Sequence, residues 1–314
     1  MTPINLSFRQ TLGSTRPIGL IYGITLVLGL VVALPFYSTL LAEDQDSRVF
    51  LNLLNGFDYT IYSDFMHRSR KAILPLISVG RWLGALYLFL SVFFAGGILF
   101  RFSQPTTRFN TGFFWQACTH YFGRFLRLFG VTFLFLLVGA GIWLVAGSLI
   151  AILANDALTE RGQFWIGAVF FACAALTGTL ILCIGDYAKV LMFREDSHQA
   201  FKSFGQAGRL VLGNILRTYG LYWLFILIGT GMFGLYFLID EAVLMSNWAT
   251  ILLMFVIQQV MIFGRIGLKV WALGAAYNTY AILSHPKPVL SLSRTSIRDA
   301  TAQLSRETFT ESLE

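Results

Sequence analysis

Six stretches without an Asp, Glu, Lys, Arg or His constrain this chain more than any other feature of its sequence. They cover residues 17–42, 82–100, 128–155, 162–185, 218–239 and 242–264. An α-helix needs about 20 residues to cross a hydrocarbon core of about 30 Å. Lipid offers no partners to backbone polar groups, so such stretches form helices or closed barrels. Barrel strands alternate over about ten residues. These stretches do not alternate, and the sequence therefore predicts six transmembrane helices.

The composition supports a membrane protein with little soluble mass. Only 12% of the residues are charged and 56% are hydrophobic, whereas a soluble domain has about 25% charged residues. We predict an all-α, six-span membrane domain over 1–283, with one sizeable outer loop at 42–72. Residues 284–314 are rich in Ser and Thr and are expected to form a polar, disordered cytoplasmic tail.

The basic residues are divided unequally between the two sides of the predicted spans. The chain has 23 Lys and Arg residues and a formal net charge of +7. Successive loops of a six-span protein lie on alternate sides of the membrane. With the loops assigned in this way, 17 of these 23 residues fall on the side that holds both termini. An excess of Lys and Arg marks the cytoplasmic side. We therefore expect a bacterial inner-membrane protein with both termini in the cytoplasm. This bias accounts for the basic residues, so no nucleic-acid partner is expected.

An internal repeat relates two parts of the chain. Residues 114–141 align without gaps with residues 204–231. The matches include polar residues and glycines, which apolar bias does not produce: Gln116/Gln206, Ala117/Ala207, Gly123/Gly213, Arg127/Arg217, Gly130/Gly220, Gly139/Gly229 and Gly141/Gly231. A third, more degenerate copy lies near the N-terminus. The repeat predicts two or three copied helical hairpins, in units of about 1–100, 101–195 and 196–283.

Amphipathic segments precede two of the predicted spans. In the clearer one, four apolar residues at helical spacing form a stripe: Ala200, Phe204, Ala207 and Val211. Asp196 or Ser197 is expected to cap this helix, and residues 113–124 repeat the pattern. A plain connector would also explain either segment. The recurrence favours cytoplasmic interfacial helices that turn their apolar stripe toward the membrane.

Charged residues beside the spans are the candidate functional residues, because charge is costly inside a membrane. The candidates for contact with lipid head groups or a protein partner are Arg124, Arg127, Lys202, Arg209, Arg217, Arg265 and Lys269. Asp186 and Lys189 are three residues apart and form a candidate interfacial polar pair. Anchoring at the interface accounts for these charges more simply than a ligand site does. The three cysteines lack metal-ligand spacing, and no catalytic, cofactor-binding or metal-binding residue is assigned.

Glycines inside the predicted spans indicate close helix packing. Gly80 and Gly84 have GxxxG spacing, and Gly96 and Gly97 follow Ala95. Small residues of this kind let helix backbones approach closely in membranes.

The outer loop offers a weaker set of candidates. Asp58, Asp64 and His67 could serve as metal ligands or as an acid–base set. No ligand-spaced motif connects them, so a small cap that packs on the span ends is favoured. Pro75 is expected to break the chain between this cap and the second span.

One stretch resembles a known group of proteins. Residues 185–225 read GDYAKVLMFREDSHQAFKSFGQAGRLVLGNILRTYGLYWLF. This resembles the inter-span connection of bacterial six-helix proteins that include the membrane domain beside glycerophosphoryl diester phosphodiesterases. The resembling features are Asp186, Ser197, Ala200 and Asn214, and the likeness covers about 110–280. It implies a six-helix architecture. The phosphodiesterase's catalytic domain has no counterpart, so its activity is not implied.

The span centres contain almost nothing polar, which argues against an ion channel, a proton pump and an ion-coupled transporter. We expect a non-enzymatic scaffold that interacts with membrane lipids or organises a protein partner through its interfacial helices or tail. A small permease or lipid transporter is the alternative, and a membrane-embedded enzyme that uses the outer-loop acids is the third. A polar cavity between repeats would favour transport, whereas a closed bundle with an exposed apolar flank would favour a scaffold.

Overall fold

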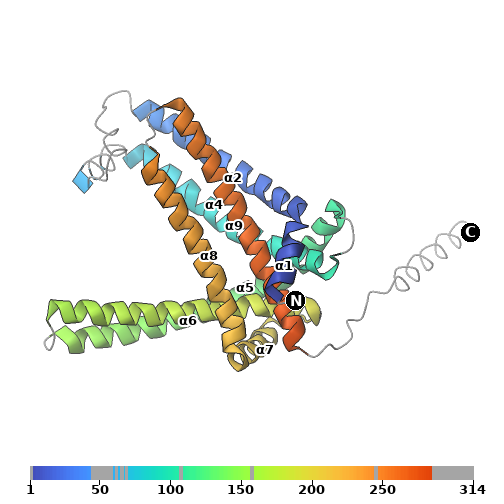
Figure 1. Ribbon diagram of the computed structural model, residues 1–314. Coiled ribbons are helices and arrows are strands. Elements are labelled where there is room, and N and C mark those ends of the chain that lie inside the picture. The colour runs from blue at the N-terminus through green and yellow to red at the C-terminus, as the bar shows by residue number, and fades with distance from the viewer. Residues whose placement is uncertain are drawn as a thin grey trace, which may run out of the picture.

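The computed structural model describes residues 3–43, 59–60, 63, 67, 70–105, 109–155, 159–243 and 247–284. These residues form helices and contain no strand. The helices are α1 (Pro3–Leu12), α2 (Thr15–Glu43), α4 (Arg70–Ser103), α5 (Thr111–Asn155), α6 (Glu160–Arg194), α7 (Ala200–Gly213), α8 (Ile215–Ala242) and α9 (Trp248–Leu283) (Figure 1). The predicted all-α class is confirmed for this part of the chain.

Six of these helices, α2, α4, α5, α6, α8 and α9, are long and apolar enough to cross a membrane. They coincide with the six uncharged stretches and indicate a multi-pass membrane protein. Several are longer than a crossing requires. Helix α5 has 45 residues and α9 has 36, which correspond to about 67 Å and 54 Å at 1.5 Å per residue. A bilayer with its head groups is about 45 Å thick, so parts of these helices must extend beyond it or tilt strongly.

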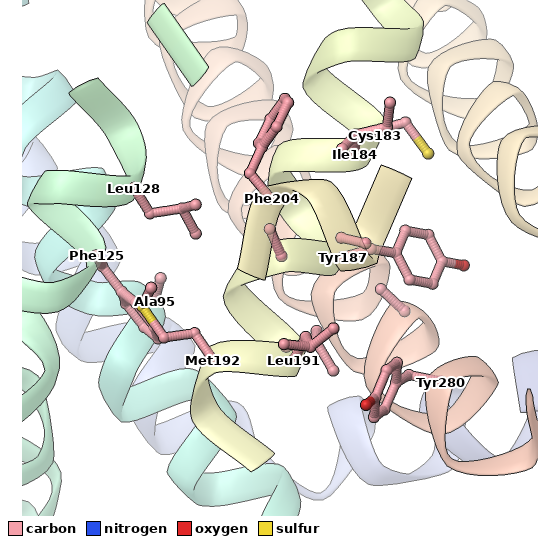
Figure 2. Close-up of a cluster of buried hydrophobic side chains, with 14 of the residues drawn as sticks. Ala95, Phe125, Leu128, Cys183, Ile184, Tyr187, Leu191, Met192, Phe204 and Tyr280 are labelled. Carbon is pink, nitrogen blue, oxygen red and sulfur yellow. The ribbon is translucent and has the colours of Figure 1, made fainter. Parts of the chain in front are cut away.

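The buried core lies at one end of the helices, where α4, α6 and α9 finish and α5 and α8 begin. We call this the core end. Figure 2 shows part of its main cluster, in which Ala95 of α4, Leu128 of α5 and Leu191 of α6 lie among other apolar side chains. A second cluster joins Ile18 of α2 to Phe94, Phe114 and Ile266. Apolar burial therefore holds the helices together mainly at this end.

Away from the core end, two groups of helices diverge (Figure 1). The α5–α6 hairpin points in one direction, and α2, α4, α8 and α9 point in another. We call this divergence of the two groups the fork. Near its base, the Tyr219 hydroxyl of α8 donates to the Leu176 carbonyl of α6 at 3.0 Å and lies 2.9 Å from Thr179 Oγ1. Few side chains are buried along the most apolar parts of α6 and α8. In the part of the chain that the structure describes, the exposed apolar flank expected of a scaffold is therefore present, but the closed bundle is not.

Helix α1 packs along the last turns of α9. The Phe8 and Trp271 rings are 4.9 Å apart, and Trp271 Nε1 donates to Ser7 Oγ at 3.1 Å. Asn278, only 8% exposed, donates to Gln10 Oε1 at 3.2 Å. This bond explains how an amide is accommodated in the otherwise apolar end of α9, because a buried polar group needs a partner.

Helix α7 exists as predicted, but its apolar stripe faces protein rather than membrane. Phe204, Ala207 and Val211 are buried in the main cluster, together with residues of α5 and α6. The Phe204 ring stacks on Phe135 with centroids 4.6 Å apart. The second predicted interfacial helix, residues 113–124, is not a separate element, because it forms the first turns of α5.

The predicted cap of α7 is wrong. Gln199 is the N-cap residue, and it makes no side-chain cap hydrogen bond. Asp196 instead follows the end of α6 with a φ of 48°, a left-handed conformation that Asp and Asn tolerate better than most residues. Ser197 Oγ lies 2.6 Å from Ser203 Oγ.

The structure does not confirm the repeat. The two aligned segments take different paths, because 114–141 lies within the unbroken helix α5 while 204–231 breaks between α7 and α8. The break falls at Asn214, whose φ and ψ are −135° and 45°. Arg124 is the aligned residue, and Arg favours helix more than Asn does. Burial is nevertheless similar at some aligned positions, including Ala117/Ala207 and Leu128/Thr218.

Pro75 does not break the chain before the second span, since it lies inside α4, which begins at Arg70. Of the outer-loop candidates, His67 is described and exposed, whereas Asp58 and Asp64 lie outside the described residues. The tail lies outside them from residue 285 onward. The predictions for the outer-loop cap and the tail therefore stay predictions.

Candidate functional site

A cluster of charged side chains occurs where α4, α6 and α9 meet. We call it the junction cluster, and it comprises Ser91, Asp186, Lys189, Arg265 and Lys269. Lys189 Nζ donates to Asp186 Oδ1 at 2.7 Å, with side chains 23% and 39% exposed. The predicted polar pair is therefore formed.

Lys269 joins α9 to α4 within the junction cluster. Its ammonium donates to Ser91 Oγ and lies 5.7 Å from the centre of the Tyr87 ring, a cation–π distance. Asp186, Lys189 and Arg265 all interact electrostatically with it. The structure thus brings four of the predicted charged residues together, although they come from two separate parts of the sequence.

A second candidate surface is the exposed side of α7, which we call the α7 outer face. It comprises Phe201, Lys202, Arg209 and Leu212. Phe201 and Leu212 are 62% and 58% exposed, although both are large and apolar. Lys202 and Arg209 are exposed beside them, and neither makes a hydrogen bond or ion pair with any described residue. An exposed helix surface that carries large apolar side chains next to basic ones is typical of helices in the membrane interface.

The remaining predicted cations divide into two kinds. Arg124 forms an ion pair with Asp196, its side chain is 12% exposed, and its guanidinium lies 5.6 Å from the centre of the Tyr121 ring. This residue ties α5 to the chain after α6, so we omit it from the proposed lipid contacts. Arg127 and Arg217 are exposed, and no described residue hydrogen-bonds to either.

Two adjacent pockets lie at the core end around Arg101 of α4. The larger, about 560 Å³, is lined by aromatic residues such as Phe109 and Phe114. The smaller, about 320 Å³, lies against α1 and includes Arg9. Arg101 donates to Ser14 Oγ at 3.4 Å and to the Gln104 carbonyl at 3.2 Å. Arg101 lines both pockets. Its two hydrogen bonds connect the end of α4 to Ser14, before α2, and to Gln104, after α4.

Sequence reasoning missed Ser91, Tyr87 and Arg101. Ser91 lies 178 residues from Lys269 in sequence, and a lone serine in an apolar span carries no signal of its own. Within the described residues, no group of three or more His, Cys, Asp or Glu side chains is placed to hold a metal ion.

Comparisons with known proteins add no relative. No protein-family model, no curated protein and no solved structure matches this chain.

Proposed function

We propose that the chain is a non-enzymatic, lipid-interacting scaffold of the bacterial inner membrane, with both termini in the cytoplasm. The observation that carries the proposal is the α7 outer face. Phe201 and Leu212 can insert below the head groups while Lys202 and Arg209 reach the phosphates of anionic lipids, as interfacial helices do.

The position of this face supports an orientation with the core end in the cytoplasm. Arg127 and Arg217, which are also exposed, lie on the same side of the spans as the α7 outer face. A cytoplasmic leaflet carries the anionic lipids that attract such residues, with about 1 kcal/mol for each Lys or Arg near the surface. The scaffold would gather anionic lipid around its cytoplasmic end and present it, together with the tail, to a protein partner.

Lipid binding by purified protein tests this proposal. The double variant Lys202→Gln/Arg209→Gln removes two near-surface charges, so its affinity for phosphatidylglycerol should fall roughly 30-fold. Native mass spectrometry of the detergent-solubilised protein measures the bound lipid. Arg161→Gln is the matched control, because Arg161 is exposed at the opposite end of α6. Unchanged retention of phosphatidylglycerol by the double variant would contradict the proposal.

Lipid transport is the second candidate function, and the fork is the observation that favours it. Two diverging apolar groups of helices could admit a lipid between them and pass it across the membrane. Proteoliposomes separate the two functions. A transporter accelerates the movement of a fluorescent phospholipid between leaflets, whereas a scaffold leaves that rate at the protein-free value.

A further inference from the structure

The junction cluster lies at the base of the fork and has unbalanced charge. Three cations, Lys189, Arg265 and Lys269, share one carboxylate, that of Asp186, which is already paired with Lys189. The partners of Lys269 among the described residues are a serine hydroxyl and the face of Tyr87, and both are neutral. Arg265 is exposed and makes no hydrogen bond or ion pair with a described residue. Two positive charges therefore remain uncompensated.

The depth of these charges along α9 matches a lipid phosphate. Helix α9 begins at Trp248, and Lys269 lies about 30 Å further along at 1.5 Å per residue. This equals the thickness of the hydrocarbon core, about 30 Å. Arg265 precedes Lys269 by four residues, so both side chains lie on the same side of the helix. An α9 that entered the hydrocarbon core at Trp248 and ran along the membrane normal would bring Lys269 to the opposite boundary, with Arg265 one turn inside it.

The surroundings of the junction cluster suit acyl chains. Toward the open end of the fork, α6 and α8 are strongly apolar and few of their side chains are buried. Uncompensated charge next to such a medium is costly unless it is paired. An anion with attached acyl chains would pair with the cations and also cover the apolar side chains of α6 and α8. A free anion would only pair with the cations.

We propose that the junction cluster binds the phosphate of an anionic phospholipid, whose acyl chains lie against the exposed apolar side chains of α6 and α8. Arg265 and Lys269 donate charge-assisted hydrogen bonds to the phosphate oxygens. The ion pair with Asp186 holds Lys189 beside the same site. This inference rests on the proposed interaction with lipids and assigns to it one internal site, separate from the α7 outer face.

Titration of the full-length protein in detergent with short-chain phosphatidylglycerol tests the site. Lys269→Gln and Arg265→Gln should each weaken binding about ten-fold, since each removes one charge-assisted contact. Lys269→Arg retains the charge and should retain most of the affinity, which separates loss of the site from loss of the fold. Inorganic phosphate and decanoate are the comparison probes. They should bind at least ten-fold more weakly than the lipid.

The variants on α7 distinguish the two proposals. If Lys202→Gln/Arg209→Gln weakens binding while both junction variants bind normally, the internal site is wrong and the scaffold proposal stands. If the junction variants and the α7 variant all bind phosphatidylglycerol as tightly as the native protein, both proposals are wrong. Inorganic phosphate that binds as tightly as the lipid would overturn the lipid as the ligand.

Discussion

Close contacts at the core end depend on glycines at particular positions. A Cβ atom added at Gly97 of α4 would lie 2.5 Å from the Phe114 ring and 2.6 Å from Cys118 Sγ, both fully or nearly buried. One added at Gly274 of α9 would overlap the Phe102 ring. By contrast, no atom of the described residues lies within 4 Å of the Cβ positions at Gly80 and Gly84. The predicted close packing is therefore confirmed at Gly97 and wrong for the GxxxG pair.

Gly97→Ala should destabilise the protein by about 1–3 kcal/mol, because overpacking a filled interior forces side chains off their preferred positions. The melting temperature in detergent measures the loss. Gly80→Ala is the control in the same helix, with open space around it. Alanine favours helix by up to about 1 kcal/mol over glycine, so this control should be neutral or slightly stabilising. Equal melting temperatures for the two variants would refute the packing role of Gly97.

At the scale of elements, α7 has two apolar sides with different partners. Phe204, Ala207 and Val211 are buried against protein, while Phe201 and Leu212 are exposed. The sequence favoured the first set as the membrane-facing side because it is the more regular stripe. A regular stripe indicates that a face is buried but does not indicate whether protein or lipid buries it.

Two phenylalanines three residues apart test the orientation of α7. Phe204→Ala should lower the stability of the solubilised protein by about 3–5 kcal/mol, the usual cost of truncating a buried aromatic residue. Phe201→Ala should leave stability in detergent nearly unchanged, because Phe201 is 62% exposed. Thermal unfolding of both variants in the same detergent provides the comparison. A larger loss for Phe201→Ala would mean that α7 docks through the opposite face.

At the scale of the whole molecule, cohesion is concentrated at one end. The spans share their core where α4, α5, α6 and α9 meet, and the α5–α6 hairpin diverges from the other four spans away from this core (Figure 1). Lipid tails are as apolar as leucine, so no hydrophobic force closes the fork in a membrane. The junction cluster and the α7 outer face both lie toward the core end, whereas few side chains are buried along the apolar parts of α6 and α8 at the other end.

Cysteine labelling in intact cells tests the proposed orientation. Thr159 lies before α6 at the open end, and His198 lies between α6 and α7 at the core end; both are exposed. In a background without native cysteines, Thr159→Cys should react with a membrane-impermeant reagent from outside. His198→Cys should react only after permeabilisation, because the proposed orientation has the core end in the cytoplasm. The reverse pattern would contradict this orientation.

The sequence predicted the number of long apolar helices and their approximate places in the chain. An uncharged stretch of about 20 residues is a local property, and its transfer to lipid does not depend on distant residues. The same reasoning found Asp186 and Lys189, which lie three residues apart on one helix. Tertiary structure alone decided the pairing of Lys269 with Ser91, the burial of α7 through Phe204 and the divergence of the α5–α6 hairpin. Each depends on which helices pack together. In an apolar chain that packing is decided by how the side chains of two helices fit each other, and a pattern within one helix does not reveal it.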